Sequence, residues 1–240
     1  VKDFFYKFYL PNNAVMVIAG AVHTEDVKKL AQKWFGGIKP GANYHRNIPQ
    51  EPLQTEARHL ETSAAVPLDS LIKVFHIPGR YETGYYAADL LSDVLGRGKS
   101  SRLYLQLLKE NPIFNSISAS VTASLDPGLL VVKGNLNPGI TLEAADAAVN
   151  NILANMVATA PSDEEIAKVK NQSEATLAFS EVELLNRAMN LAFAANAGNV
   201  DWANDDAELI RNLTSDDIHV AAKNAVKPEN GSTLYYRAEK

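Results

Sequence analysis

The sequence contains no cysteine, which excludes disulfide bonds, thiol catalysis and zinc sites built from cysteine, but leaves the cellular compartment open. It also lacks an apolar run near the roughly 20 residues that a membrane-spanning helix needs. Basic residues are not in excess, because the chain has 23 Lys and Arg residues against 28 Asp and Glu residues, which gives a net charge of −5. Without a cluster of Lys and Arg, this balance argues against a nucleic-acid-binding surface.

A histidine pair with metal-binding spacing is also missing. The five histidines are His23, His45, His59, His76 and His219, and none has a second histidine three or four residues away. A catalytic zinc site needs three protein ligands and one open position. The sequence therefore predicts no metal-binding, catalytic or cofactor-binding residues in this chain.

A Gly-Lys-Ser core, Gly98-Lys99-Ser100, is the most conspicuous motif that is present. A phosphate-binding loop needs a further glycine where Asp93 stands, and it follows a buried strand. Here the preceding residues Leu90, Leu91, Val94 and Leu95 have helical spacing instead. A nucleotide site remains a third alternative that rests on this core alone.

Hydrophobic content of 46% and charged content of 21% are ordinary for a globular protein of 240 residues. The residue patterns predict helices and strands in an α+β arrangement, with helices segregated to one face of an antiparallel-rich sheet. The expected strands are Ala14–Gly20, which should be buried, and residues 55–63, 70–77, 115–124, 129–136 and 232–237. The expected helices are residues 2–9, 25–35, 141–158, 162–195 with a break near Ser180, 199–212 and 215–225, besides those flanking the Gly-Lys-Ser core.

The two ends of the chain resemble each other. When Val1 is set over Ile218, Pro11 falls on Pro228 and Asn13 on Asn230, and each end reads as a helix, a Pro-x-Asn turn and a strand. The shared order suggests a duplicated unit. Since the chain opens on a stretch typical of the interior of a helix, we expect it to be a piece of a longer protein.

Four segments in register closely resemble the insulinase/pitrilysin-like zinc peptidases, the inverted zincins, including their bacterial members that are similar to mitochondrial processing peptidase. They are FFYKFYLPNNAVMVIAG, HTEDVKKLAQKWFGGIKPG, LLSDVLGRGKSSRLYLQLLKE and PSDEEIAKVKNQSEA. The resemblance covers essentially the whole chain. It implies repeated α+β units, each a sheet with helices packed on it, and two halves that close around a peptide.

The resemblance also implies a domain division. Residues 1–45 would be the C-terminal tail of a zinc-bearing first unit, residues 46–54 a linker, and residues 55–240 a complete second, non-catalytic unit. The zinc of the parent protein would lie in the missing part, because His-x-x-Glu-His is absent here. Leu108 and Asn115 stand where many family members have an Arg and a Tyr that hold the substrate, so this unit should not supply those contacts.

For Gly96, Gly98, Ser100 and Ser101 the resemblance implies a role in holding the N-terminal end of a substrate peptide. The alternative is a tight connection between two helices, with positive φ at both glycines and Ser100 capping the second helix. Arg102 would then be a structural ion-pair partner.

Two functions follow from the resemblance. The chain is expected to form the substrate-chamber wall and scaffold of a zinc endopeptidase, inactive in isolation, whose partners are a peptide substrate, the missing first unit and a second half, fused or separate. The alternative is a non-catalytic partner subunit or interaction domain of the same family. A homo-oligomer is a further option, and a periplasmic or exported location is favoured over the cytoplasm.

Overall fold

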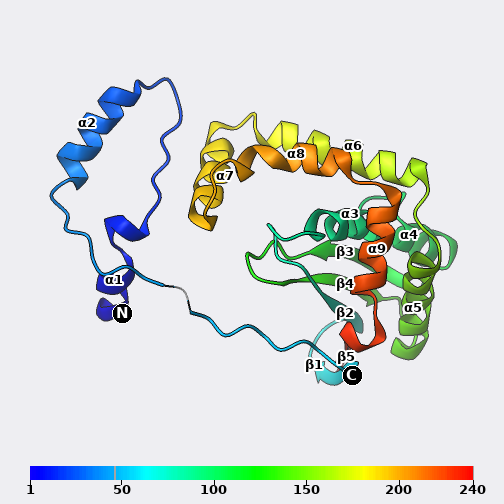
Figure 1. Cartoon of the computed structure of the whole chain (residues 1–240). Coiled ribbons are helices and arrows are strands. Elements are labelled where there is room, and N and C mark those ends of the chain that lie inside the picture. The colour runs from blue at the N-terminus through cyan, green and yellow to red at the C-terminus, as the bar shows by residue number, and fades with distance from the viewer. Residues whose placement is uncertain (46, 240) are drawn as a thin grey trace. The chain divides into compact units, whose positions relative to one another are not determined.

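The computed structural model describes residues 1–45 and 47–239 (Figure 1). Arg46, in the predicted linker, and Lys240, at the end of the predicted second unit, lie outside the described residues. The chain forms two compact units, one of Val1–Pro52 with Glu174–Glu208 and one of Leu53–Ser173 with Leu209–Lys240. The predicted division into residues 1–45, 46–54 and 55–240 follows the boundaries of duplicated units, whereas the two compact units follow internal contacts. The predicted division therefore stays a prediction.

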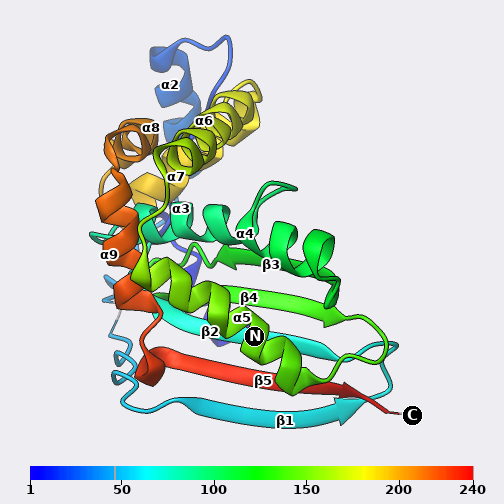
Figure 2. The same cartoon turned by 90° about the vertical axis from the view of Figure 1, so that its right-hand side faces the viewer.

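The larger unit is built on a five-stranded sheet of order β1-β5-β2-β4-β3. The strands are β1 (Arg58–Ala64), β2 (Ser70–Ile77), β3 (Phe114–Val121), β4 (Gly128–Leu136) and β5 (Gly231–Ala238). Only β1 and β5 run parallel, and the other neighbours are antiparallel. Figure 2 shows β1 and β3 at the two edges.

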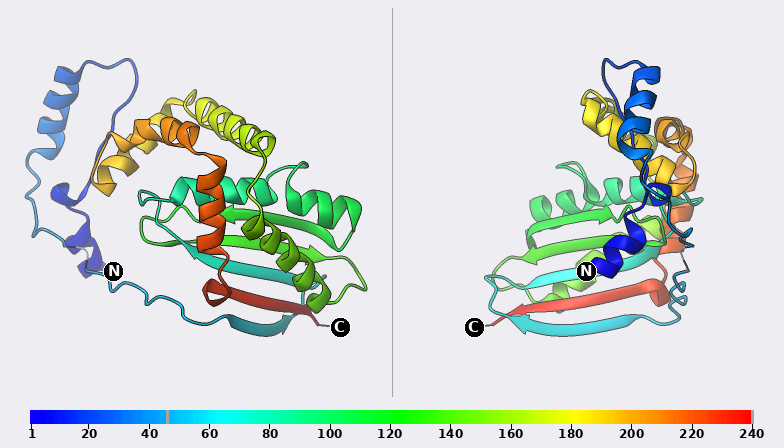
Figure 3. Two further views of the ribbon diagram at one scale, coloured as in Figure 1. Left: turned by 45° about the vertical axis from the view of Figure 1, so that its right-hand side comes forward. Right: turned by 90° about the vertical axis from the view of Figure 1, so that its left-hand side faces the viewer.

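The helices of this unit pack on one face of the sheet, as Figure 2 and the right-hand view of Figure 3 show from opposite sides. They are α3 (Tyr85–Gly96), α4 (Arg102–Tyr104) continued by the π-helical turn η2 (Leu105–Glu110), α5 (Leu142–Ala158), α9 (Ser215–Ala225) and the 3₁₀ turn η3 (Pro228–Asn230). The expectation of an α+β fold with helices on one face is confirmed.

The core lies between this sheet face and the helices. Leu71, Phe75 and Ile77 alternate along β2 and are each at most 5% exposed, while Leu91 and Leu95 of α3 are fully buried. Alternation along the strand and a spacing of three or four along the helix turn these side chains toward each other. Burying each large apolar side chain stabilises the fold by about 1.5–3 kcal/mol.

The smaller unit contains α1 (Lys2–Phe8), the 3₁₀ turn η1 (Pro11–Asn13), α2 (Thr24–Phe35) and α7 (Leu184–Ala197). Helices α6 (Asp163–Ser180) and α8 (Trp202–Asn212) have residues in both units. None of α1, η1 and α2 contains a buried residue. Large apolar side chains are exposed instead, including Phe4 at 60%, Trp34 at 67% and Phe35 at 52%.

One predicted element is wrong. Ala14–Gly20 was expected to be a buried strand, yet it pairs with no strand among the described residues, and Met16 and Ile18 are 54% and 48% exposed. The apolar pattern favours burial in a sheet, but a strand needs a neighbour for its N–H and C=O groups. The described residues supply no neighbour for this segment.

The other predicted elements are present within a few residues. β2 and α9 have the predicted bounds, and the helical pattern of residues 162–195 breaks between Ser180 and Leu184 as expected.

The two ends of the chain also share local geometry. The Asn13 side chain donates a 2.8 Å hydrogen bond to the carbonyl of Phe8, and the Asn230 side chain donates a 2.8 Å bond to the carbonyl of Ala225. Each asparagine closes a 3₁₀ turn after a helix and reaches five residues back. Asn230 makes one bond more, to the carbonyl of His76 on the neighbouring strand β2.

Candidate functional site

The predicted peptide-holding residues lie together in the connection between α3 and α4. Gly96 is the last residue of α3, and Gly98, Ser100 and Ser101 precede Arg102, the first residue of α4. We call residues 96–101 the Gly-rich loop. The Gly-Lys-Ser core therefore follows a helix, which is not the strand context of a phosphate-binding loop.

The two glycines have different structural roles. A Cβ on Gly96 would lie 2.0 Å from the backbone N of Ala119 on β3, so glycine is needed for the close packing of α3 on the sheet. Gly98 has φ +78, and a Cβ there would meet nothing within 4 Å. The alternative of a tight connection between two helices expects positive φ at both glycines, and only Gly98 has it, because Gly96 still belongs to the helix.

The two serines also differ. Ser101 is fully buried, and its Oγ donates a 2.8 Å hydrogen bond to the carbonyl of Gly98, which folds the loop back on itself. Ser101, rather than Ser100 as predicted, occupies the N-cap position of α4, because this turn displaces the helix start by one residue. Ser100 is exposed, and its carbonyl accepts a 3.0 Å hydrogen bond from Lys168 of α6.

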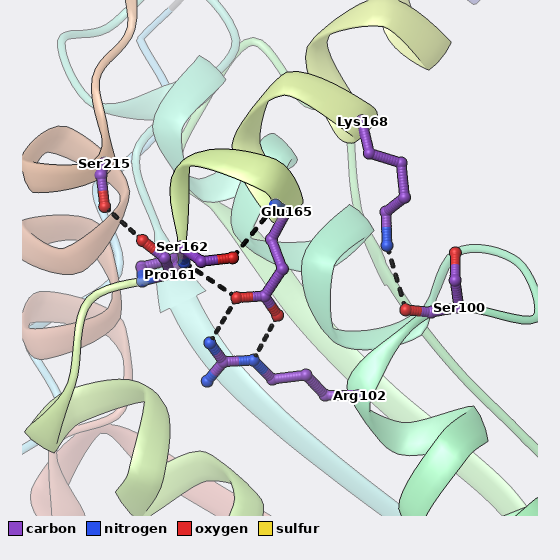
Figure 4. A network of polar contacts seen from close by, with 7 residues as sticks. All are labelled: Ser100, Arg102, Pro161, Ser162, Glu165, Lys168 and Ser215. Atoms are coloured by element: carbon purple, nitrogen blue, oxygen red, sulfur yellow. Dashed lines mark hydrogen bonds and ion pairs between the residues drawn. The ribbon is translucent and has the colours of Figure 1, made fainter.

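Arg102 anchors the C-terminal end of the loop (Figure 4). Its Nε and Nη2 donate hydrogen bonds of 2.7 and 2.8 Å to the two carboxylate oxygens of Glu165, a two-point contact on α6. The hydrogen bond from Arg102, helped by the backbone N–H of Ser162, lowers the pKa of Glu165 to about 2. The prediction that Arg102 is a structural ion-pair partner is confirmed.

The same glutamate closes a capping box at the start of α6, as the Ser-x-x-Glu spacing of Ser162 and Glu165 in the sequence predicts. The Ser162 N–H donates to the Glu165 carboxylate at 2.9 Å, and the Glu165 N–H donates to the Ser162 Oγ at 3.2 Å. Just before it, the Pro161 carbonyl accepts a 2.6 Å bond from the Ser215 Oγ of α9 (Figure 4). The Gly-rich loop is therefore held on a fixed frame while the space above Gly98 stays open.

The residues that replace the family's Arg and Tyr lie just beyond. Leu108 is in the π-helical turn η2, and Asn115 is exposed in β3, where the pairing with β4 shifts register between Phe114 and Ser116. Neither side chain can give the cationic or phenolic contact that the resemblance associates with these positions.

Zinc, which the resemblance implies for the parent protein, does not fit the residues of this chain that the structure describes. Nowhere among residues 1–45 and 47–239 do three or more His, Asp or Glu side chains gather closely enough to hold a metal ion. His219 instead lies 2.8 Å from the Val157 carbonyl, and His59 packs edge-on against Tyr235. We derive no chemical step through a metal in this chain. Among the same described residues, no helix is long and apolar enough to cross a membrane.

Sequence reasoning missed a buried polar network under the sheet. Lys73 of β2 is 6% exposed, and its ammonium donates bonds of 2.6 Å to Asp146 and 2.8 Å to the Thr233 hydroxyl. The Tyr235 hydroxyl donates to the other Asp146 oxygen at 3.1 Å. Burial, followed by the charge of Asp146, raises the pKa of Tyr235 to about 12. A lysine at an inward position between Leu71 and Phe75 was the available signal.

Comparison with known proteins identifies the family. Residues 1–173 match the peptidase M16 inactive domain. The chain belongs to this family. Zinc protease PqqE of Helicobacter pylori is 23% identical to this M16 inactive domain over 181 residues, which are 73% of the chain and 40% of that protein.

Solved structures show the same fold. A protease from Helicobacter pylori has a TM-score of 0.90 at 22% identity, over 98% of this chain and 58% of that one. The first half of the periplasmic protease PqqL from Escherichia coli has a TM-score of 0.78 at 12% identity, over 99% of this chain and 54% of that one. The M16 inactive domain described here therefore spans 40% to 58% of the length of these relatives. The chain is therefore a non-catalytic domain that is related to zinc proteases.

Proposed function

We propose that this M16 inactive domain forms part of the substrate-chamber wall and scaffold of a zinc endopeptidase whose metal is held by a unit outside this chain. The observation that carries the proposal is the match of residues 1–173 to the inactive domain of a peptidase family. The zinc-protease names of its relatives and the absence of a metal-binding cluster in the described residues support it.

The exposed apolar surface of the smaller unit supports a covering partner. α1 and α2 bury no residue, and Phe4, Trp34 and Phe35 are each more than half exposed. Large apolar side chains that gather on an exposed surface usually mark a protein–protein contact. We assign the partner as the metal-bearing unit, whose sheet would include residues 14–20.

The duplicated turn supports that assignment. Asn230 bonds both its own helix and the neighbouring strand β2, whereas Asn13 bonds only its own helix among the described residues. Residues 1–45 are accordingly the tail of a first unit, with its missing strands in the parent protein. Residues 55–240 are the second unit, and residues 46–54 link the two.

The Gly-rich loop is the proposed contact for the N-terminal end of a substrate peptide. Gly98 leaves open space around its Cα, and Ser100 is exposed, while Gly96 and Ser101 hold the loop in place. Replacing Gly98 by Ala should raise the KM of the parent enzyme for peptides and leave its zinc content unchanged. An unchanged KM would remove the loop from the substrate path.

A non-catalytic partner subunit is the second candidate, and Leu108 and Asn115 favour it, because they lack the substrate-holding groups of the resemblance. The parent gene separates the two. A His-x-x-Glu-His motif upstream of Val1 supports the endopeptidase, and its absence supports the partner subunit. We place the parent outside the cytoplasm, as its relative PqqL is described as periplasmic; an export signal in the same gene tests this.

A further inference from the structure

A cavity of about 600 Å³ lies between the C-terminal half of α5 and the starts of β1 and β5. No residue of the Gly-rich loop lines it. Its apolar walls come from Phe75 on β2, Leu153, Ala154 and Val157 on α5, and Pro228. Its volume is in the range of pockets that hold small ligands.

The charged groups of the cavity all have one sign. Arg58, Lys73 and Lys227 line it, and none of the described Asp and Glu residues does. The chain as a whole has the opposite balance, with a net charge of −5. Arg58 and Lys227 make no ion pair within the described residues. Since Asp146 already pairs with Lys73, the positive charge open to a ligand comes mainly from Arg58 and Lys227, and the cavity therefore complements an apolar group that bears a negative charge.

Lys73 gives the cavity a fixed polar group. Its ammonium has three hydrogens, and the described residues offer two acceptors, Asp146 and Thr233. Because the side chain is only 8% exposed and both contacts are short, the ammonium cannot swing away. The third hydrogen is available to an acceptor inside the cavity.

The cavity also lies at the start of an edge strand. β1 is the last strand of the sheet order, and within the part of the chain that the structure describes it pairs on one side only, with β5. An exposed edge can take an extended peptide as an added strand. A peptide that runs antiparallel to β1 would end beside Arg58, the first residue of that strand.

We propose that this cavity binds the C-terminal residue of an extended peptide. The apolar side chain of that residue would lie against Phe75, Leu153 and Val157. Its carboxylate would be held by Lys73, Arg58 and Lys227. This proposal rests on the proposed function at one point only, namely the choice of a peptide, rather than a fatty acid, as the molecule that supplies the apolar carboxylate.

The test measures binding of a fluorescein-labelled alanine pentapeptide extended by a C-terminal Phe, by fluorescence anisotropy on the full chain. No hydrolysis is involved, so the result is independent of any zinc-bearing unit. Amidating the peptide's carboxylate should weaken binding about tenfold, since it removes the charge-assisted bonds. Equal binding of the acid and the amide would overturn the proposal. So would a result in which the peptide does not bind, while a fluorescent fatty acid binds and is displaced by dodecanoate.

Two pairs of variants locate the site. Ala154→Phe fills the cavity from an exposed helix position and should abolish binding, while Ala147→Phe, exposed on the same helix outside the cavity, should not. Lys227→Glu should weaken binding at least fivefold, unlike Lys223→Glu, which makes the same charge change outside the cavity. If each control variant weakens binding as much as its partner, the cavity is not the site.

Discussion

Arg102 and Glu165 make a two-point ion pair that fastens the Gly-rich loop to the first turn of α6, with the side chains 18% and 26% exposed. Because the pair is partly buried and Glu165 also caps α6, Glu165→Gln should lower the free energy of unfolding by about 2 kcal/mol. Urea denaturation measures the change. Glu164→Gln, exposed in the same helical turn, is the control and should change it by less than about 0.5 kcal/mol.

The same carboxylate makes stability depend on acid pH. Its pKa is lowered to about 2 in the folded chain, below the ordinary value of 4.5. The stabilisation is therefore complete above about pH 4.5 and is lost as the pH falls toward 2. Unfolding free energy measured across that window should fall less steeply for Glu165→Gln than for the unchanged chain. Parallel curves would show that the ion pair does not titrate with folding.

Tyr235 should make the stability of the chain depend on pH in the alkaline range as well. Its pKa is raised to about 12 from the ordinary 10, since burial and the Asp146 charge disfavour the phenolate. Its contribution is complete below pH 10 and is lost as the pH rises toward 12. Tyr235→Phe should remove one late-titrating phenol from the tyrosinate absorbance curve of the folded chain. An unchanged curve near pH 12 would contradict the buried contact with Asp146.

The Lys73–Asp146 pair should show strong coupling. Lys73→Met leaves the Asp146 carboxylate without its cation at a site that is 19% exposed, and should cost about 3 kcal/mol of stability. The double variant Lys73→Met with Asp146→Leu should lose at least about 1 kcal/mol less than the sum of the two single changes, as expected for groups in contact. Simple additivity in thermal or urea unfolding would contradict the pairing.

The two glycines of the loop should respond differently to alanine. Gly96→Ala forces a Cβ into the backbone of Ala119 and should destabilise the chain by at least about 2 kcal/mol. Gly98→Ala meets only the strain of a positive φ and should cost about 1 kcal/mol. Equal losses in urea denaturation would contradict the helix–strand contact at Gly96.

The sequence was most informative for elements whose structure is determined by the residues of a single segment. The spacing of Leu90, Leu91 and Leu95 predicted α3, and the Ser162–Glu165 pattern predicted the capping box that begins α6. Ala14–Gly20 could not be settled in this way, because a strand depends on neighbours that the segment itself does not specify. The cavity beside α5 could not be predicted either, since Arg58, Lys73 and Lys227 are brought together only by folding.

Peptide hydrolysis and zinc content of the isolated chain test the central claim most directly, namely that this M16 inactive domain works only with a metal-bearing unit. The purified chain, incubated with zinc and then desalted, should retain no stoichiometric metal, since the described residues offer no group of ligands. It should not cleave a quenched fluorescent peptide, and the parent protein that carries the zinc-bearing unit should. One tightly held zinc per chain together with chelator-sensitive cleavage by the isolated chain would contradict the account.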